Sequence, residues 1–296
     1  MVKYHHYTVA GHTFTVCLPN TEETITFSSY EPFAVDVVPQ GVNPLFSLVV
    51  DDAFYPTAKG ESIGDFDCGA ADFGVYRLPD GSYQMLISPP GGQYCGLLQA
   101  TPDFSQGTIA TRGDDSLRTF AVNNALMLMY AFASATKGTL LVHASVIKND
   151  ERGYLFLGQS GTGKSTHSSL WLKHIEGSEL LNDDNPVIVV DGKGATVYGS
   201  PWSGKTPCYK NLSLPLGGVT RLSQAPHNRM RALGKLEAFG ALLPSCPPNF
   251  AYDEALTDRM CEIIGAVIKT TPVYHLECLP DRAAAELSFN ILSNGR

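Results

Sequence analysis

Residues 158–166 read Gly158-Gln159-Ser160-Gly161-Thr162-Gly163-Lys164-Ser165-Thr166. They fill every fixed position of the pattern G-x-x-x-x-G-K-[ST]. Glycines allow backbone angles at which successive N–H groups converge on phosphate oxygens, and a helix beginning at the lysine adds its positive dipole end. We therefore expect all nine residues to bind ATP or GTP, with the ammonium of Lys164 at the terminal phosphates and the hydroxyl of Ser165 on Mg²⁺.

The segments around this loop have the strand–loop–helix order that such a motif requires. An apolar strand is predicted at Tyr154–Leu157, directly before the loop, and a helix at Lys164–His174, directly after it. A further strand, Leu140–Ile147, is separated from the first only by the short turn Asn149–Gly153. Because the turn is short, these two strands should pair antiparallel, so a mixed sheet is expected rather than an all-parallel one.

Two adjacent carboxylates, Asp183 and Asp184, come next along the chain. They follow a short apolar run and precede Pro186, which places them at a strand end or in a turn. Phosphoryl transfer needs oxygen ligands for Mg²⁺ and a group that takes the proton of the acceptor, and two carboxylates can divide these tasks. Such an Asn/Asp-rich turn is commonly only a solvated connection, but the phosphate-binding motif upstream favours the functional interpretation.

Two further features carry weaker signals. His143 lies on the strand predicted at Leu140–Ile147, where a histidine is more often structural than functional. The irregular segment Gly199–Lys210 contains two prolines, two lysines and Trp202. It predicts either a pocket wall that contacts a ligand or a surface connection whose tryptophan fills a gap in the core.

Together these residues resemble the catalytic domain of HPr kinase/phosphorylase, within the wider group of P-loop kinases built like phosphoenolpyruvate carboxykinase. The resemblance rests on His143, the strand–turn–strand unit, the loop sequence and the Asp183-Asp184 pair, and it covers residues 140 to 200. The histidine precedes the first loop glycine by 158 − 143 = 15 positions, as in the family. The chain resembles HPr-kinase-related proteins of unassigned substrate more than a true HPr kinase.

The resemblance implies a role for each matching residue. Lys164 would bind phosphate and Ser165 would bind Mg²⁺, Asp183 would act as base or metal ligand with Asp184 beside it, and His143 would assist near the reacting phosphate. The implied catalytic residues are thus Asp183, His143 and Lys164, and the implied metal ligands are Ser165, Asp183 and Asp184. The implied fold is the α/β core of these kinases, with a mixed sheet.

The two halves of the sequence differ in predicted secondary structure, which predicts two domains. Residues 1–115 indicate a β-rich accessory domain and residues 116–296 the kinase-like α/β domain. In the first half, strands are predicted at 7–9, 13–17, 33–38 and 45–50, with a hairpin over 74–87 that turns at Asp80-Gly81 and a further turn at 89–92. In the second, helices are predicted at 119–135, 233–243, 254–269 and from about 281, a hairpin over 187–198, and a strand at 272–278.

Composition narrows the class of partner. The formal net charge of −8 argues against a surface that lies along nucleic acid. The chain opens without a signal-peptide pattern, and its longest apolar stretch, 120–135, is too short and too polar to span a bilayer. The seven cysteines are scattered without CxxC spacing, which predicts reduced thiols and a cytoplasmic location; a homo-oligomer is possible.

Three functions remain open from the sequence. The first is a kinase that moves the γ-phosphoryl group of ATP to a hydroxyl on a protein, a peptide or a small molecule. The second is a carboxykinase-type enzyme, which would need further metal ligands and arginines; after Lys164 the chain offers few arginines besides Arg221, Arg229 and Arg231. The third is a nucleotide-binding regulatory module without transfer chemistry.

Overall fold

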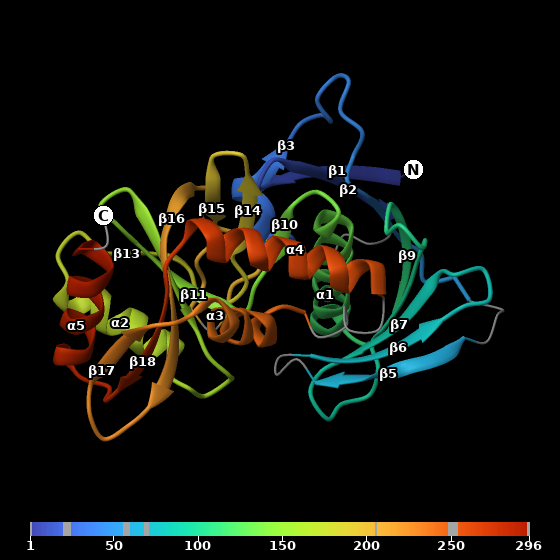
Figure 1. Ribbon diagram of the computed structural model, residues 1–296. Helices are drawn as coiled ribbons and strands as arrows, with labels where there is room; N and C mark the ends of the chain where they lie inside the picture. Colours follow the sequence, from blue (N-terminus) through green and yellow to red (C-terminus); the bar gives the residue numbers. More distant parts are fainter. Residues whose placement is uncertain are drawn as a thin grey trace. The chain divides into compact units, whose positions relative to one another are not determined.

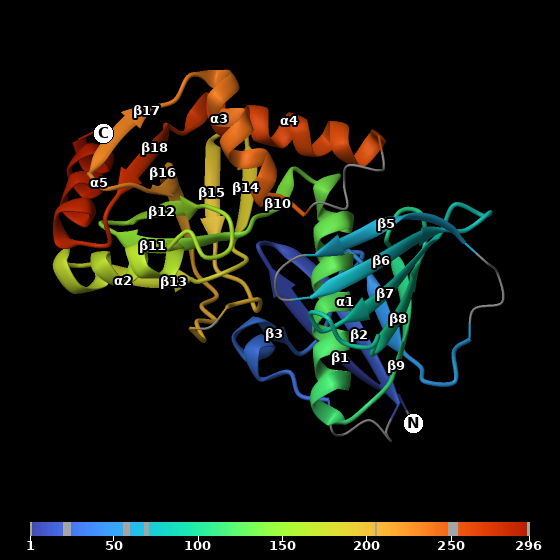
Figure 2. The same cartoon turned by 90° about the horizontal axis from the view of Figure 1, so that it is seen from below.

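The computed structural model describes residues 2–19, 25–55, 60–67, 71–204, 206–247 and 254–294. Its contacts divide the chain into two compact units, Met1–Lys137 with Pro248–Thr257, and Gly138–Pro247 with Asp258–Arg296. Each unit contains one large sheet, so the protein is of the mixed α/β class (Figures 1 and 2). No helix within the described ranges is long and apolar enough to cross a membrane.

The first unit is built on a nine-stranded sheet in the order β3-β1-β2-β4-β9-β8-β7-β6-β5. Its neighbouring strands pair antiparallel except β2 with β4 and β4 with β9, which are parallel. The strands are β1 Val2–Val9, β2 His12–Pro19, β3 Ala34–Val35, β4 Ser47–Val50, β5 Glu61–Asp67, β6 Asp72–Arg77, β7 Tyr83–Ser88, β8 Gly96–Ala100 and β9 Gln106–Thr111.

The hairpin predicted around Asp80-Gly81 is confirmed as β6 and β7. Gly81 has φ +85°, a value that glycine adopts without strain, and the carboxylate of Asp80 accepts a bond from the amide of Ser82 at 2.9 Å. The strand predicted at 33–38 is wrong for most of its length. A 3₁₀ turn, η1 Ser28–Phe33, occupies its start and only Ala34–Val35 are extended, because Tyr30 and Phe33 are buried by the turn.

Helix α1, Asp115–Ala135, packs against β7, β8 and β9 of the first sheet (Figure 2). Its first turn is capped by Asp114, whose carboxylate accepts the amide of Leu117 at 2.9 Å. A sequence-based boundary at residue 115/116 placed this helix in the second domain. The contacts place it in the first unit instead, because its Ala, Leu, Met and aromatic side chains are buried against that sheet.

The second unit has a mixed sheet in the order β10-β14-β15-β16-β12-β11-β13, with β18 on β16 and β17 on β18. Strand β12 is antiparallel to β11 but parallel to β16, which confirms the mixed sheet. The strands are β10 Thr139–Leu141, β11 Ala144–Asn149, β12 Arg152–Leu157, β13 Glu179–Asn182, β14 Val187–Asp191, β15 Gly194–Tyr198, β16 Ser213–Gln224, β17 Arg229–Ala232 and β18 Val273–Cys278.

Four helices lie close to their predicted ranges: α2 Lys164–His174, α3 Lys235–Leu242, α4 Glu254–Thr270 and α5 Arg282–Asn294. A 3₁₀ turn, η2 Leu243–Ser245, comes directly after α3. Helices α2 and α5 contact each other and bury a cluster that includes Tyr154, Phe156 and Trp171 (Figure 1). The indole of Trp171 donates to the hydroxyl of Ser288 at 2.8 Å, so the cluster also joins α2 to α5 by a buried hydrogen bond.

The single strand predicted at Leu140–Ile147 is two strands. β10 pairs with β14, whereas β11 pairs with β12 and β13, and the chain changes partner at Val142 and His143. The amide of Val142 donates to Pro186 O at 3.1 Å and that of His143 to Ser245 O at 2.6 Å, so both are satisfied outside the sheet. His143 therefore lies in the break between two strands and not within a strand.

Candidate functional site

The loop 158–163 leads from the buried strand β12 into helix α2, in the order expected. Gly161 has φ +80° and Gly163 has φ +109°, angles that a side chain would make costly. Gly163 is the N-cap of α2, so the unbonded amides of the first helical turn lie at the end of the loop. Such an arrangement of amides, with the positive end of the helix dipole, attracts anions.

Lys164 is buried, although it carries a charge. Its Nζ donates to Gly158 O at 2.8 Å, so the side chain folds back over the start of the loop. Burial lowers the pKa of Lys164, and the carboxylates of Asp184 and Asp183 oppose that effect. The ammonium is therefore held beside both the loop and the aspartate pair, where it can contact an anion.

Asp183 and Asp184 lie directly after β13, at the strand end that the sequence predicted. Asp183 is only 5% exposed, and its Oδ1 accepts a bond from Ser145 Oγ at 3.1 Å. The hydroxyl of Ser145 has one hydrogen, so Ser168 Oγ, 2.7 Å away, must donate to it. Oδ2 of Asp183 is buried with no hydrogen-bond partner, which is uncommon for a carboxylate and leaves it open to a ligand or a proton.

His143 faces Asp184 across the site. The distance between His143 Nδ1 and Asp184 Oδ1 is 3.4 Å, and the histidine side chain is 38% exposed. Burial lowers the pKa of His143, the charge of Asp184 opposes this, and Lys164 lowers it further. Burial raises the pKa of Asp184, against the charges of His143 and Lys164. The lowered pKa favours the neutral imidazole, in which one ring nitrogen can accept a hydrogen bond.

The structure therefore brings together His143, Lys164, Asp183 and Asp184, which are 41 positions apart at most along the chain (184 − 143). The expected metal ligand Ser165 is the second residue of α2 and is exposed. Among the described His, Cys, Asp and Glu residues, no group of three or more could hold a metal ion by itself. A Mg²⁺ ion usually keeps several waters and takes one or two carboxylates plus phosphates, so the set is suited to an ion that arrives with a nucleotide.

The segment Gly199–Lys210 is fastened to the aspartate turn. Trp202 is 7% exposed, and its carbonyl accepts the amide of Asn185 at 3.2 Å. A Cβ on Gly204 would lie 3.1 Å from Asp183 O and 3.2 Å from Asp184 Cβ, so the backbone approaches closely there. Lys210 donates to Glu179 at 3.1 Å, while Lys205 lies outside the described residues. The tryptophan thus fills the core and holds the segment against the carboxylates.

Sequence reasoning missed three residues of the site. Ser145 lies two positions after His143, and Ser168 lies four positions after Lys164 on the same face of α2, so spacing alone could have selected both. Gln224, at the end of β16, donates from Nε2 to Gly161 O at 3.2 Å. No local pattern marks Gln224, because its contact depends on the parallel pairing of β12 with β16.

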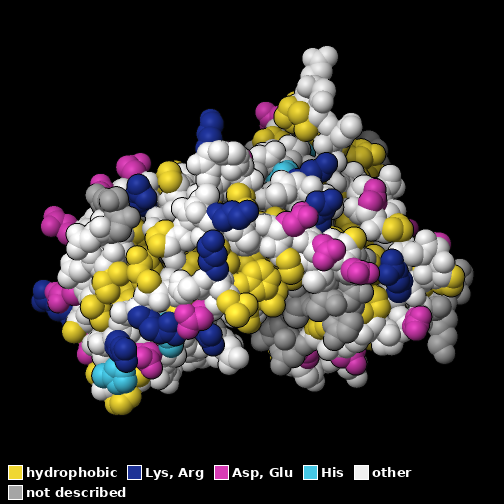
Figure 3. All heavy atoms as spheres, in the orientation of Figure 1, with side chains coloured by type: hydrophobic (Ala, Val, Ile, Leu, Met, Phe, Trp, Pro, Cys, Tyr) yellow, Lys and Arg dark blue, Asp and Glu magenta, His cyan; other side chains and the backbone are white. Residues whose placement is uncertain are grey.

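The arginines relevant to a carboxykinase lie on β16 and β17. Arg221 and Arg231 are both in register with His275 of β18, and Arg229 is in register with Glu277. Arg231 is engaged by Glu237, with Nη2 2.8 Å from Oε1. On the face drawn in Figure 3, basic and acidic side chains lie intermixed. Of the three arginines, Arg231 is therefore already paired with a carboxylate.

The chain matches no protein-family model, and no curated protein matches it either. The chemistry of the site therefore has to follow from its own residues.

Proposed function

We propose that the protein is an ATP-dependent phosphotransferase of the HPr-kinase-like type, which moves the γ-phosphoryl group to a hydroxyl acceptor on a protein, a peptide or a small molecule. The observation that carries the proposal is the buried oxygen Oδ2 of Asp183, which has no partner and lies in the same site as Lys164. A glycine-rich loop supports nucleotide binding, and an adjacent carboxylate oxygen without a hydrogen-bond partner supports proton transfer.

In the proposed reaction the acceptor hydroxyl attacks the γ-phosphorus. The new bond joins the acceptor oxygen to phosphorus, the bond to the bridging β–γ oxygen breaks, and ADP leaves with that electron pair. Asp183 takes the acceptor's proton on Oδ2, while Ser145 holds Oδ1 and thereby fixes the carboxylate. Lys164 and the loop amides stabilise the charge on the phosphates.

Magnesium fits the remaining donors. Ser165 and Asp184 would hold the ion with the phosphates and water, and Asp183 can contribute an oxygen; bound there, Mg²⁺ neutralises charge on the transferred group. The neutral imidazole of His143 would orient the reacting phosphate or take up a proton from it.

The six described cysteines are free, which supports a location in the reducing cytoplasm. They are Cys17, Cys95, Cys208, Cys246, Cys261 and Cys278.

The test begins with binding, since this step does not require the acceptor. Calorimetric titration of the folded chain with Mg²⁺-ATP and with Mg²⁺-GTP should give saturable binding that EDTA weakens. The protein is then incubated with ATP labelled on the γ-phosphate and with small-molecule and peptide fractions of a cell extract. Label should appear on a hydroxyl of an acceptor.

Three other outcomes would contradict this proposal in different ways. Bicarbonate-dependent turnover of phosphoenolpyruvate would assign the carboxykinase reaction instead. Tight nucleotide binding with no transfer to any fraction would leave a regulatory module. If the folded protein bound neither nucleotide, the phosphate-binding interpretation of the loop would be wrong.

A further inference from the structure

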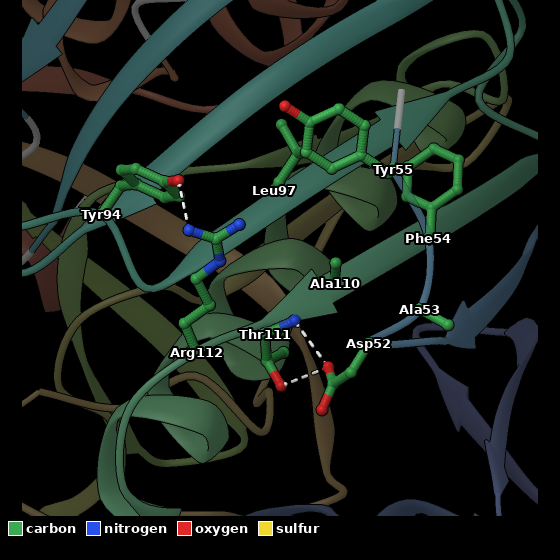
Figure 4. A pocket seen from close by; sticks show the side chains of 9 residues that line it. All are labelled: Asp52, Ala53, Phe54, Tyr55, Tyr94, Leu97, Ala110, Thr111 and Arg112. Atoms are coloured by element: carbon green, nitrogen blue, oxygen red, sulfur yellow. Dashed lines mark hydrogen bonds between the residues drawn. The ribbon is translucent and has the colours of Figure 1, made fainter. Parts of the chain in front are cut away.

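A separate pocket of about 130 Å³ lies within the first unit (Figure 4). It is formed by the loop that follows β4, the start of β8 and the end of β9. Its walls include the rings of Phe54, Tyr55 and Tyr94 and the guanidinium of Arg112, with Asp52 and Thr111 below them in Figure 4. The volume suits on the order of four water molecules, or a carboxylate on a short alkyl chain.

The one carboxylate of the pocket lining, that of Asp52, is already paired with an arginine. Oδ1 of Asp52 accepts the amide of Thr111 at 2.7 Å and its hydroxyl at 2.9 Å. Oδ2 accepts Nη2 of Arg118 at 2.6 Å. Asp52 is thus fully bonded, and its charge is compensated by an arginine outside the lining.

Arg112 differs from Arg118 in having no acidic partner. Its Nη1 donates to Tyr94 Oη at 2.7 Å, and the guanidinium carbon lies 5.2 Å from the centre of the same ring. No carboxylate among the described residues pairs with it. A guanidinium has five N–H donors, so Tyr94 fixes the group while leaving most of its donors unused.

The aromatic walls are exposed to an unusual degree for large side chains. Tyr55 is 76% and Tyr94 is 44% exposed. Tyrosine and arginine together are the residue types that most often anchor a bound partner, because they offer apolar area and directed polar groups. The pocket therefore combines one uncompensated cation with amphipathic rings around it.

We propose that this pocket binds a carboxylate carried on a short alkyl chain, with the free donors of Arg112 on the carboxylate and the tyrosine rings on the alkyl part. The same chemistry is presented by a free dicarboxylic acid and by a glutamate side chain of a peptide. The site lies in a different unit from the phosphate-binding loop, so it does not depend on the proposed phosphotransferase function.

The test is titration of the full chain with glutarate at low ionic strength, followed by calorimetry and by NMR of the arginine side chains. Glutarate should bind and shift the side-chain resonances of Arg112, whereas the neutral glutaramide should not. Arg112→Gln should weaken glutarate binding at least about tenfold, the size expected for loss of a charge-assisted hydrogen bond. Tyr94→Phe keeps the ring but removes the bond that fixes Arg112, so a smaller loss is expected.

Arg77→Gln is the matched control, because Arg77 also lies over a tyrosine, 5.4 Å from the centre of the Tyr83 ring, in the same unit. It should bind glutarate like the unaltered protein. Both arginine variants should keep their melting temperature and nucleotide affinity, so a failure here is distinct from a failure of the phosphotransferase proposal.

A peptide with one glutamate and blocked ends, tested in parallel, shows whether the bound carboxylate belongs to a free acid or to a protein side chain. Tighter binding of the peptide than of glutarate would assign the site to protein side chains, and equal or weaker binding would assign it to free acids. The proposal is overturned if neither probe binds, if glutaramide binds as well as glutarate, or if Arg112→Gln binds glutarate normally.

Discussion

Asp52 in the first unit and Asp183 in the second are each held by a neighbouring hydroxyl, yet their remaining oxygens differ. The side chain of Asp52 is 35% exposed and has both oxygens bonded, to Thr111 and Arg118. Asp183 is nearly buried and has only Oδ1 bonded. A carboxylate oxygen without a hydrogen bond costs more folding free energy when it is buried than when it is exposed to water. Stability alone would therefore favour two bonded oxygens on Asp183 and an unbonded oxygen on Asp52. The difference marks Asp52 as structural and Asp183 as a functional candidate.

The largest effect on nucleotide affinity is expected from removing the cation beside Asp183. Lys164→Ala should weaken Mg²⁺-ATP binding at least about 100-fold, because bonds to charged groups contribute ~1.5–3 kcal/mol each and the ammonium serves several phosphate oxygens. Calorimetric titration measures this. Lys210→Ala removes a lysine that is bonded to Glu179 instead and should bind normally. Unchanged affinity in Lys164→Ala would show that the loop does not hold phosphate.

The next effect tests the two carboxylates directly. Asp183→Asn should keep nucleotide affinity within about threefold but lower phosphoryl transfer about 100- to 10,000-fold, the range typical of a lost general base. Asp52→Asn is the matched control and should transfer phosphate at the normal rate. Release of labelled phosphate to the acceptor or to water provides the measurement. Normal turnover by Asp183→Asn would remove its assignment as the base.

Asp52 should instead show its effect in stability. Asp52→Ala removes a carboxylate bonded to Arg118, whose side chain is only 18% exposed, and two bonds from Thr111. We expect a loss of about 1–3 kcal/mol in the free energy of unfolding, with nucleotide affinity unchanged. Urea titration followed by tyrosine fluorescence measures the first quantity. A drop in nucleotide affinity without a drop in stability would contradict the assignment.

The smallest effect concerns the hydroxyl that holds Asp183. Ser145→Ala removes the bond to Oδ1 and the link to Ser168, so the carboxylate keeps its charge but loses its fixed orientation. Transfer should fall about threefold to tenfold, in keeping with ~1 kcal/mol for one hydrogen bond, while nucleotide affinity stays the same. Ser169→Ala, on the exposed side of the same helix as Ser168, should leave the rate unchanged.

Much of this site could be predicted from sequence because its signals are local. The loop, the start of α2 at Lys164 and the strand end at Asp183 depend on a few consecutive residues. The break at His143 could not be predicted, because it arises where the chain changes from one pairing partner to another.

Strand β16 was missed for a different reason. It lies between β15 and β12 and contains Pro215, Gly217 and Gly218, residues that normally argue against a central strand. The structure gives a physical cause for the first glycine: a Cβ on Gly217 would lie 2.8 Å from the ring of Tyr154. Glycine there is required by a neighbour that is remote in sequence, which no local pattern contains.

Three consecutive amides, those of Val142, His143 and Ala144, donate to Pro186, Ser245 and Asp184 respectively. The position of the imidazole is therefore set by two distant stretches of chain, the aspartate turn and the short 3₁₀ turn that ends α3. Alterations in that 3₁₀ turn should displace His143 although none of its residues belongs to the candidate catalytic set. A directed search for variants with altered activity would accordingly do well to include positions near residue 245, far along the chain from the loop.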